Sequence, residues 1–337
     1  MEGDRILYRG SKVSVIVVNW NGATLLAACL RSLSAQTYRD FEIIVVDNGS
    51  EDRSAINVAH AFSQVTLVAL GENSGFAGGN LAALRIANGE FLALVNNDTR
   101  VEPYWLEKLI QPMLHNSALG ICASKIIIEG SGKIDSIGTA VTTAGVGFNC
   151  TAREHSDSHE AFAPVFGACG AAALYRGRML EEIGFFDKDF FLYDEDTDLS
   201  FRAQLAGWKC VYVPTAVVYH IGHATTGRLS DTHVYYHTRN LEFVWIKNMP
   251  LGLMLRFAHH KLIQELGSFC YLCLRHGKWR PYFRAKRDAL KMIPVMLRRR
   301  KEVQSRRRVS NKYLRQLMTS IFSLVIIRRK FFQFVKG

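Results

Sequence analysis

Two short apolar segments that end abruptly in polar residues constrain the fold of this chain more than any other feature. The apolar residues 91–95 run directly into the polar residues 96–98, which end in Asp98, and the apolar residues 41–46 run into Asp47. A short apolar segment without alternation is typical of a strand buried on both faces, as in a parallel sheet. Ligands bind beyond the carboxyl ends of such strands. The two segments therefore predict an open α/β sheet with acidic residues at the mouth of a ligand cleft.

The first 250 residues continue this alternation of strands and helices. Further strands are expected at 13–19, 65–70, 119–128, 166–175 and 209–220, and helices at 23–36, at 195–206 and in segments that end near 62 and 87. Alternation at this spacing indicates βαβ units, whose right-handed crossovers bring the strand ends to one edge. The predicted fold is therefore α/β, with a Rossmann-like, mainly parallel central sheet. Residues 130–163 are expected to form a hairpin or a mobile loop.

Charge divides the 337-residue chain into two parts. Residues 251–337 hold 22 Lys and Arg against 3 Asp and Glu, whereas the first 250 residues carry a net charge of −7. We therefore expect a globular domain over residues 1–248 and a basic, amphipathic helical region over 249–337. Breaks in the helical region are expected near Pro250, Pro281 and Pro294.

The polar residues that follow the strands are candidate ligand-binding groups. Asp47 could lie beside a base or a ribose, but it could equally cap the next helix. The glycine-rich residues 75–80 would let a phosphate or sugar approach the backbone, although they lack the dinucleotide-binding spacing. Asp98 is the more specific candidate, because a hard divalent cation prefers oxygen ligands and would bridge a carboxylate to a diphosphate.

Four of the five residues 194–198 are acidic, and they open a predicted helix. Stabilisation by the helix dipole explains one or two acids there. Four acids repel one another and raise some of their pKa values, so that one could act as a general base on an acceptor hydroxyl. His220 and His223 follow a strand, where they could contact a metal or a phosphate or could be structural.

Taken in order, these segments resemble family 2 glycosyltransferases of the GT-A type, and among them the bacterial rhamnosyltransferases. The resemblance covers residues 12–248 and keeps the order and spacing of the motifs. The segments that carry it are 15–22, 46–50, 73–80, 96–98, 194–202 and 218–220. Arg239-Asn240 also resembles the rhamnosyltransferase subgroup.

The resemblance implies a role for individual residues. The residues expected to bind the donor are Asn19, Asn21, Asp47, Asn48, Gly75, Gly78, Asn80 and Asn97. Asp98 corresponds to the last acid of the family's Asp-x-Asp metal motif, whose first acid is replaced here by Asn96, and His220 to a histidine that faces the metal or the diphosphate. The expected cofactor is a divalent metal, Mg²⁺ or Mn²⁺. Asp196 corresponds to the catalytic base, with Glu195 beside it.

The implied activity is inverting transfer of a sugar from a nucleoside diphosphate to a hydroxyl group. The donor would be a dTDP- or UDP-sugar, with L-rhamnose from dTDP-rhamnose favoured, and the acceptor a lipid-linked or cell-envelope polysaccharide glycan. A non-catalytic nucleotide-sugar or carbohydrate-binding protein on the same fold is the alternative. Its acids would be substituted, whereas Asp47, Asp98 and Asp196 are all present.

The basic region suggests a partner for the second part of the chain. Clustered cations beside aromatic and aliphatic residues suit anionic lipids, and residues 316–327 form an apolar stretch too short to span a bilayer but long enough to lie in its surface. A solvated helical bundle is the alternative. Nucleic acid is not expected as a partner, because no binding motif accompanies the charge. We expect no signal peptide and no membrane-spanning helix, and a cytoplasmic protein peripheral to the inner face of the cell membrane.

Overall fold

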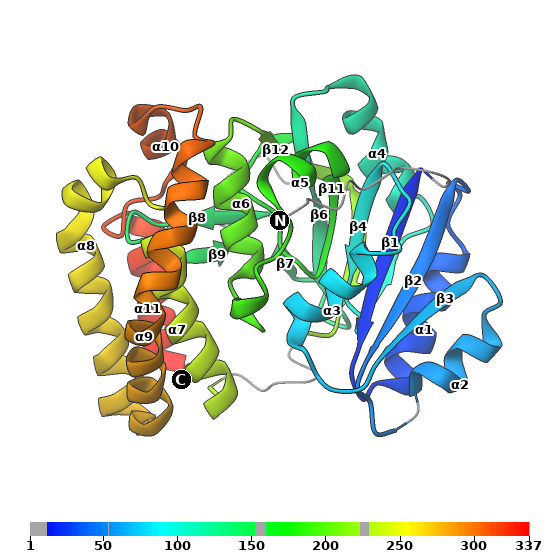
Figure 1. Cartoon of the computed structure of the whole chain (residues 1–337), viewed down its shortest axis with the longest axis horizontal. Coiled ribbons are helices and arrows are strands. Elements are labelled where there is room, and N and C mark those ends of the chain that lie inside the picture. The colour runs from blue at the N-terminus through cyan, green and yellow to red at the C-terminus, as the bar shows by residue number, and fades with distance from the viewer. Residues whose placement is uncertain (1–11, 53, 152–159, 223–228, 337) are drawn as a thin grey trace.

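The computed structural model describes the chain except for residues 1–11, 53, 152–159, 223–228 and 337 (Figure 1). The N-terminal residues in which no signal peptide was expected, and the candidate His223, lie outside the described residues.

A ten-stranded sheet forms the centre of the molecule. Its main path runs β10-β12-β6-β11-β4-β1-β2-β3, with β5 paired to β12 and β7 paired to β6. Along this path β10 and β11 run against the other six strands, so the predicted mainly parallel sheet is confirmed. The strands are β1 (Val13–Asn19), β2 (Phe41–Asn48), β3 (Val65–Leu70), β4 (Phe91–Val95), β5 (Thr99–Val101), β6 (Leu119–Ile128), β7 (Ile134–Ser136), β10 (Ala163–Pro164), β11 (Ala172–Arg176) and β12 (Lys209–His220).

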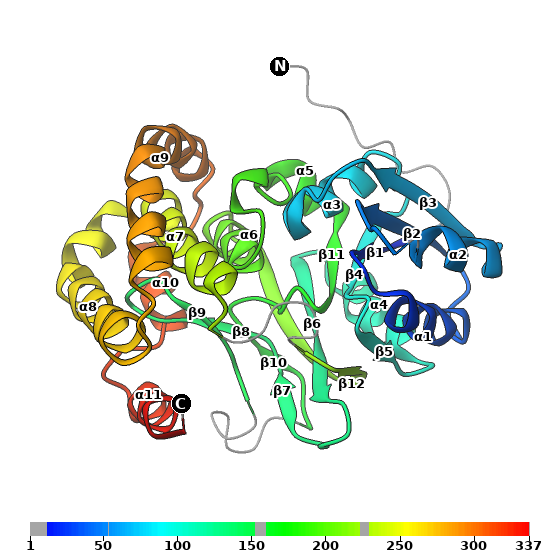
Figure 2. The same ribbon diagram turned by 90° about the horizontal axis from the view of Figure 1, so that it is seen from below.

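Helices cover both faces of the sheet, which explains why its central strands lack polar alternation. Val15 and Val17 of β1 belong to the core on one face, and Ile16 belongs to the core on the other. The first face carries α1 (Ala23–Ser34), α2 (Ser54–Ala61) and α4 (Trp105–His115), and the second carries α3 (Gly75–Leu84), α5 (Gly177–Ile183) and α6 (Glu195–Leu205). Figure 2 shows α3 and α5 on one side of the strands and α1 and α4 on the other.

The middle of the chain differs in part from the prediction. The expected hairpin exists, formed by β8 (Thr139–Val141) and β9 (Gly147–Asn149). The expected strand at 166–175 is wrong at its start, because β11 begins only at Ala172. Gly167 instead packs so closely on α6 that an added Cβ would lie 2.1 Å from the hydroxyl of Ser200. The small residues before β11 therefore let α6 pack closely against the backbone, where we had expected a ligand to do so.

The C-terminal region is helical, as predicted, and lies at the end of the sheet away from β1–β3 (Figure 1). It contains α8 (Leu251–Phe269), the π-helical segment η2 (Cys270–Arg275), α9 (Trp279–Ser305), α10 (Asn311–Leu317) and α11 (Leu324–Lys336), and it packs against α7 (Asp231–Asn248). The predicted break at Pro294 is wrong, since α9 continues through it with Ala289 and Met296 buried on either side. One hydrophobic core joins α8 and α9 to α6 and α7, and the boundary at 248/249 stays a prediction.

The apolar residues 316–327 do not form one surface segment. α10 ends at Leu317, α11 begins at Leu324, and Thr319 between them pairs with Thr142 in an isolated parallel bridge. Ile321 and Ile326 are buried. Phe322, Leu324 and Ile327 are 49–69% exposed, so the stretch is only partly buried, and its contact with a membrane surface stays a prediction. No helix among the described residues has both the length and the apolar character needed to cross a membrane.

Candidate active site

The polar residues at the ends of β1, β2 and β4 meet at one edge of the sheet. Asn19 and Asp47 are register partners in the parallel pair of β1 and β2. The amide of Asn97 donates to Oδ1 of Asn19 over 2.8 Å, and the amide of Asn19 donates to the Ser54 hydroxyl, also over 2.8 Å. The structure thus brings three predicted donor-binding residues together from separate strands.

Local turns hold the loops beside these strand ends. Oδ1 of Asp47 accepts the backbone N–H of Ser50 over 3.0 Å, and the Ser50 hydroxyl accepts the N–H of Asn21 over 3.1 Å. Asn21 has a φ of 50°, and its side chain accepts the N–H of Glu51. Asp47 therefore organises the turn after β2, and its contact with a nucleoside stays a prediction.

The loop before α3 contains the glycines that were predicted to face a ligand. In the structure these glycines pack against other residues of the protein. Asn48 donates to the side chain of Asn73 over 3.0 Å. Gly75 has a φ of 75°, and a Cβ there would lie 2.3 Å from the carbonyl oxygen of Phe191. A Cβ at Gly78 would meet Ser74, and Asn80 donates to a carbonyl of its own helix. These contacts bring the loop against the segment before Asp196, whereas its donor-binding role stays a prediction.

Asp98 and His220 lie together, as predicted. Nε2 of His220 is 3.3 Å from Oδ1 of Asp98, and Nδ1 is 3.5 Å from Oδ2 of Asp135. Burial lowers the pKa of His220, but the carboxylates of Asp135 and Asp98 outweigh it and raise the pKa to about 9. Sequence reasoning missed Asp135, because it lies on β7, a three-residue strand without a recognisable pattern.

These residues could supply part of the coordination of a divalent cation, with phosphate groups of a substrate supplying the rest. Oδ1 of Asn96 is buried without a hydrogen-bond partner among the described residues. The 3.3 Å between Asp98 and His220 is close to the spacing of neighbouring ligands on an octahedral cation, about 3 Å. Within the described residues no three His, Cys, Asp or Glu side chains form a ready metal site. Mg²⁺ often binds through one or two carboxylates and substrate phosphates, which this donor set would allow.

Glu195 and Asp196 open α6, with Glu195 buried and Asp196 half-buried. Oδ2 of Asp196 accepts the N–H of Gly170 over 2.9 Å, and Oδ1 accepts the N–H of Thr197 over 2.6 Å. Gly170 adjoins Ala171, whose carbonyl accepts the N–H of Asn96, so Asp196 sits beside the end of β4. Burial raises the pKa of Asp196. Burial, and then the charge of Asp196, raise the pKa of Glu195 well above its usual range.

The other two acids of this cluster are structural. Asp198 is fully buried and binds Arg202, Lys247 and Asn248, with the shortest contacts at 2.8 Å. Burial raises the pKa of Asp198, but Lys247 and Arg202 outweigh it and lower the pKa to about 2. Asp194 binds His237 over 2.8 Å. The pKa increase expected from repulsion among the four acids is therefore found at Glu195 and Asp196.

A strained segment precedes the acids, and a buried amide supports it. Phe191, Tyr193 and Asp194 all have positive φ values, between 63° and 70°, which cost roughly 1–2 kcal/mol each. The side-chain amide of Asn240 lies within 2.9 Å of the carbonyl oxygens of 190, 192 and 193. Arg239 donates to Oδ1 of Asn240 and so fixes the amide orientation. The sequence singled out Arg239 and Asn240, but gave no reason for them.

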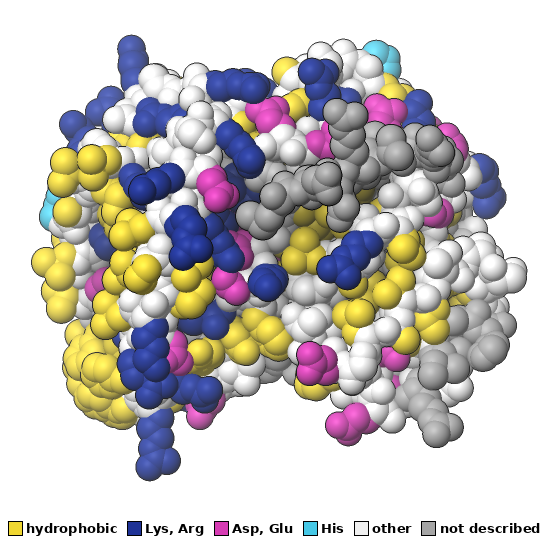
Figure 3. Space-filling model, in the orientation of Figure 1, with side chains coloured by type: hydrophobic (Ala, Val, Ile, Leu, Met, Phe, Trp, Pro, Cys, Tyr) yellow, Lys and Arg dark blue, Asp and Glu magenta, His cyan; other side chains and the backbone are white. Residues whose placement is uncertain are grey.

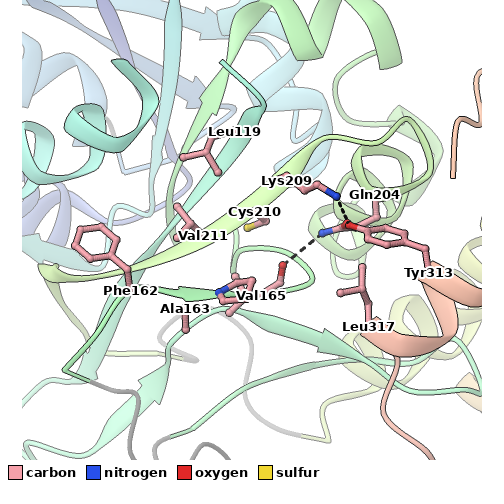
Figure 4. Close-up of a pocket in the computed structure, with 11 residues that line it drawn as sticks. Leu119, Phe162, Ala163, Val165, Gln204, Lys209, Cys210, Val211, Tyr313 and Leu317 are labelled. Carbon is pink, nitrogen blue, oxygen red and sulfur yellow. Dashed lines mark hydrogen bonds between the residues drawn. The ribbon is translucent and has the colours of Figure 1, made fainter. Parts of the chain in front are cut away.

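A separate hollow of about 220 Å³ lies between the edge of the sheet and α10 (Figure 4). Its lining is mostly apolar and includes Leu119, Val211 and Leu317, with Lys209 donating to the hydroxyl of Tyr313. It contains none of the predicted site residues. We assign it to the packing of the C-terminal helices on the sheet.

The sequence profile described as Glycosyl transferase family 2 matches residues 14–184, about half of the chain. The chain belongs to this family. The match spans β1 to α5, including the strand ends that carry Asn19, Asp47 and Asp98. Asp196 and His220 lie beyond it, so their roles rest on the site described above.

Curated relatives extend the similarity past this profile. The N-acetylglucosaminyl-diphospho-decaprenol L-rhamnosyltransferase of Mycobacterium tuberculosis (strain ATCC 25618 / H37Rv) is 25% identical over 249 residues, which cover 67% of this chain and 81% of that protein. EpsH of Bacillus subtilis (strain 168), which bears the name of a glycosyltransferase, is 28% identical over 219 residues, covering 64% of this chain and 62% of EpsH. The chain therefore spans less than two thirds of EpsH.

A solved structure confirms the fold. The crystal structure of GalNAc-T7 with UDP, GalNAc and Mn²⁺ superposes with a TM-score of 0.56 at 15% sequence identity, covering 76% of this chain and 54% of that one. At this identity the likeness concerns the fold alone. The predicted GT-A fold is confirmed.

Proposed function

We propose that this chain is an inverting glycosyltransferase that moves a sugar from a nucleoside diphosphate to a hydroxyl group of an acceptor. The observation that carries the proposal is the placement of Asp196. Its half-buried carboxylate is held by two backbone N–H groups beside the strand end that bears Asn97 and Asp98. A base is thereby fixed next to the groups that would hold the donor.

The surroundings of the two adjacent carboxyls support different roles for them. Asp196 receives hydrogen bonds from Gly170 and Thr197, which stabilise its charged form. Oε2 of Glu195 is buried without a hydrogen-bond partner among the described residues. A proton is therefore held more readily by Glu195, and Asp196 stays ionised as the base.

The reaction is a single displacement. The acceptor oxygen bonds to the anomeric carbon from the face opposite the diphosphate, the bond from that carbon to the diphosphate oxygen breaks, and Asp196 takes the acceptor proton. Inversion follows, and no carboxylate nucleophile is needed. A divalent cation, held by Asp98 with Asn96 and His220, would neutralise the charge that gathers on the leaving diphosphate.

The donor we favour is dTDP-rhamnose, and the acceptor a lipid-linked or cell-envelope glycan. The name of the mycobacterial relative, an N-acetylglucosaminyl-diphospho-decaprenol L-rhamnosyltransferase, supports rhamnose as the sugar and a lipid-linked acceptor. A lipid-linked acceptor would also make attachment at the cytoplasmic face of the cell membrane useful, in keeping with the net charge of residues 251–337.

The test pairs Asp196→Asn with Glu195→Gln. Asp196→Asn should lower transfer from dTDP-rhamnose by about 10²–10⁴-fold, while the thermal shift produced by dTDP with Mg²⁺ or Mn²⁺ is unchanged. Glu195→Gln resembles the protonated acid and should cost much less. Equal losses would show that the two roles are wrongly divided. Stabilisation by UDP instead of dTDP would reject the rhamnose donor, and nucleotide binding without any transfer would favour a binding protein.

A further inference from the structure

Helix α8 carries an apolar face that is exposed to solvent. α8 has a kink at Phe257, where the backbone is not helical. Leu251 and Leu255 lie four residues apart before the kink, and Leu262 and Leu266 lie four apart after it, with 57–73% of each residue exposed. We call these four exposed leucines the leucine stripe. The opposite face of α8 packs into the core through Leu253 and Phe257. Figure 3 shows hydrophobic side chains gathered at the left edge of the molecule, where Figure 1 places α8. An apolar stripe of this length on a surface helix is typical of an interaction site.

Further large apolar side chains are exposed after the end of α8. Leu274 in η2 and Trp279 and Phe283 at the start of α9 are 62%, 43% and 53% exposed. Trp279 and Phe283 stack on each other with ring centroids 6.2 Å apart. Tryptophan and phenylalanine are common where a helix enters the boundary between lipid headgroups and acyl chains.

The charges around this surface are almost all positive. Glu265 is paired with Lys261 and Lys286. Asp288 is shared among cations of α9, which include Arg284 and Arg287. The neighbourhood of the stripe therefore holds an excess of cations, and its acids are already neutralised.

A basic hollow of about 370 Å³ lies at the first turns of α8, where Gly252 and Leu253 line it. Arg256 lines it from α8, and Lys312 and Arg315 line it from α10. Among the described residues these three cations form no ion pair. Three unpaired cations around a hollow of this size suit a phosphate group.

We propose that α8 lies flat on an anionic membrane, with its leucine stripe in the acyl boundary and a lipid phosphate in the basic hollow. A second copy of the chain fits this face poorly, because a two-fold contact would set the same cations against one another. Nucleic acid would satisfy the cations but leave the leucines exposed to water. An anionic bilayer satisfies both.

This inference refines the membrane part of the proposed function and does not depend on the sugar transferred. It moves the contact from residues 316–327, which are partly buried, to α8. Vesicle binding and sugar transfer are separate measurements, so the two proposals can fail independently.

The first experiment is sedimentation of the full chain with phosphatidylcholine vesicles, with and without phosphatidylglycerol. Leu262→Glu should weaken binding to phosphatidylglycerol vesicles by about tenfold or more, because a leucine would leave the acyl boundary. Leu114→Glu, on α4, is the matched control, since Leu114 is 48% exposed and lies outside the stripe. It should bind like the wild type. An unchanged midpoint of urea denaturation would show that Leu262→Glu is folded.

The second experiment tests the hollow at constant charge. Lys312→Ala/Arg315→Ala and Arg298→Ala/Lys301→Ala each remove two exposed cations, but only the first pair lines the hollow. The first pair should lose about tenfold in affinity for phosphatidylglycerol vesicles, and the second clearly less. Equal losses would overturn the phosphate site. Equal binding to both lipids, or a Leu262→Glu protein that binds vesicles normally but changes from dimer to monomer, would overturn the membrane assignment.

Discussion

The two halves of the proposed site are built in different ways. In the donor half, Asn19 and Asn97 hydrogen-bond across neighbouring parallel strands at the edge of a rigid sheet. In the catalytic half, residues 191–194 have a strained backbone, and they are held by Asn240 and by the buried charges around Asp198. Substitutions in the first half should therefore reduce donor affinity at a modest cost in stability. In the second half they should reduce stability and rate together.

Lys247→Met should have the largest effect on stability. Lys247 is almost fully buried and bridges Asp187 and Asp198, so its removal weakens the support of two buried carboxylates. We expect a loss of roughly 3–5 kcal/mol in the free energy of unfolding, measured by urea denaturation. Lys261→Met is the control, because Glu265 keeps its contact with Lys286. Similar losses in both variants would show that buried ion pairs in the catalytic half contribute no more to stability than those elsewhere.

Asn240→Ala should come next. Its amide lies near three carbonyl oxygens of the strained segment, at about 1 kcal/mol for each contact. A loss of about 3 kcal/mol in unfolding free energy is expected, with a lower kcat because Asp196 is less firmly placed. Asn88→Ala is the control, since Asn88 is exposed and its side chain donates only to the carbonyl of Ile86 among the described residues. A raised KM for the donor with kcat unchanged would place Asn240 in donor binding instead.

Acid should weaken the same half through Asp198. Lys247 and Arg202 lower its pKa from 3.8 to about 2 despite burial. A lowered carboxyl pKa stabilises the folded state above the unfolded pKa, and this contribution is lost as the pH falls from 4 towards 2. We expect a loss of about 2 kcal/mol over that interval. Urea denaturation at pH 4 and pH 2 measures it, and Asp198→Asn should remove this part of the pH dependence. If Asp198→Asn loses as much unfolding free energy at low pH as the wild type, the acid sensitivity comes from groups other than Asp198.

The strand ends that form the donor half could be predicted from the sequence because their signals are local. An apolar segment followed by Asp47 or Asp98 identifies both a buried strand and the edge of the sheet at which it ends. The residues alone predicted the catalytic half only as a cluster of acids, and it was the family resemblance that singled out Asp196 as the base. The division between Asp196, a candidate base, and Asp198, a structural anion, depends on Lys247, some fifty residues later in the chain. The hydrophobic periodicity of the sequence cannot predict such a contact between distant residues.

The C-terminal region illustrates the same limit. Composition predicted helices and a basic surface, but it could not tell which apolar residues face the core. The stretch 316–327 is continuous in sequence and partly buried, whereas the exposed leucines of α8 are scattered among other residues. Pro294 was expected to end a helix, yet packing of α9 on both sides overrides the missing hydrogen bond.

The smallest predicted effect offers the sharpest comparison of the two halves. Asn19→Ala should lower the affinity for dTDP with Mg²⁺ by a few-fold and the unfolding free energy by about 1 kcal/mol, because Ser54 and Asn97 each lose a partner. In a double-mutant cycle on unfolding free energy, Asn19 and Asn97 should couple by roughly 0.5–1 kcal/mol, whereas Asn19 and Asn240 should be additive within about 0.5 kcal/mol. Strong coupling of Asn19 to Asn240 would mean that the contact of Gly75 with Phe191 joins the halves into one unit. Donor binding would then itself help to position the base.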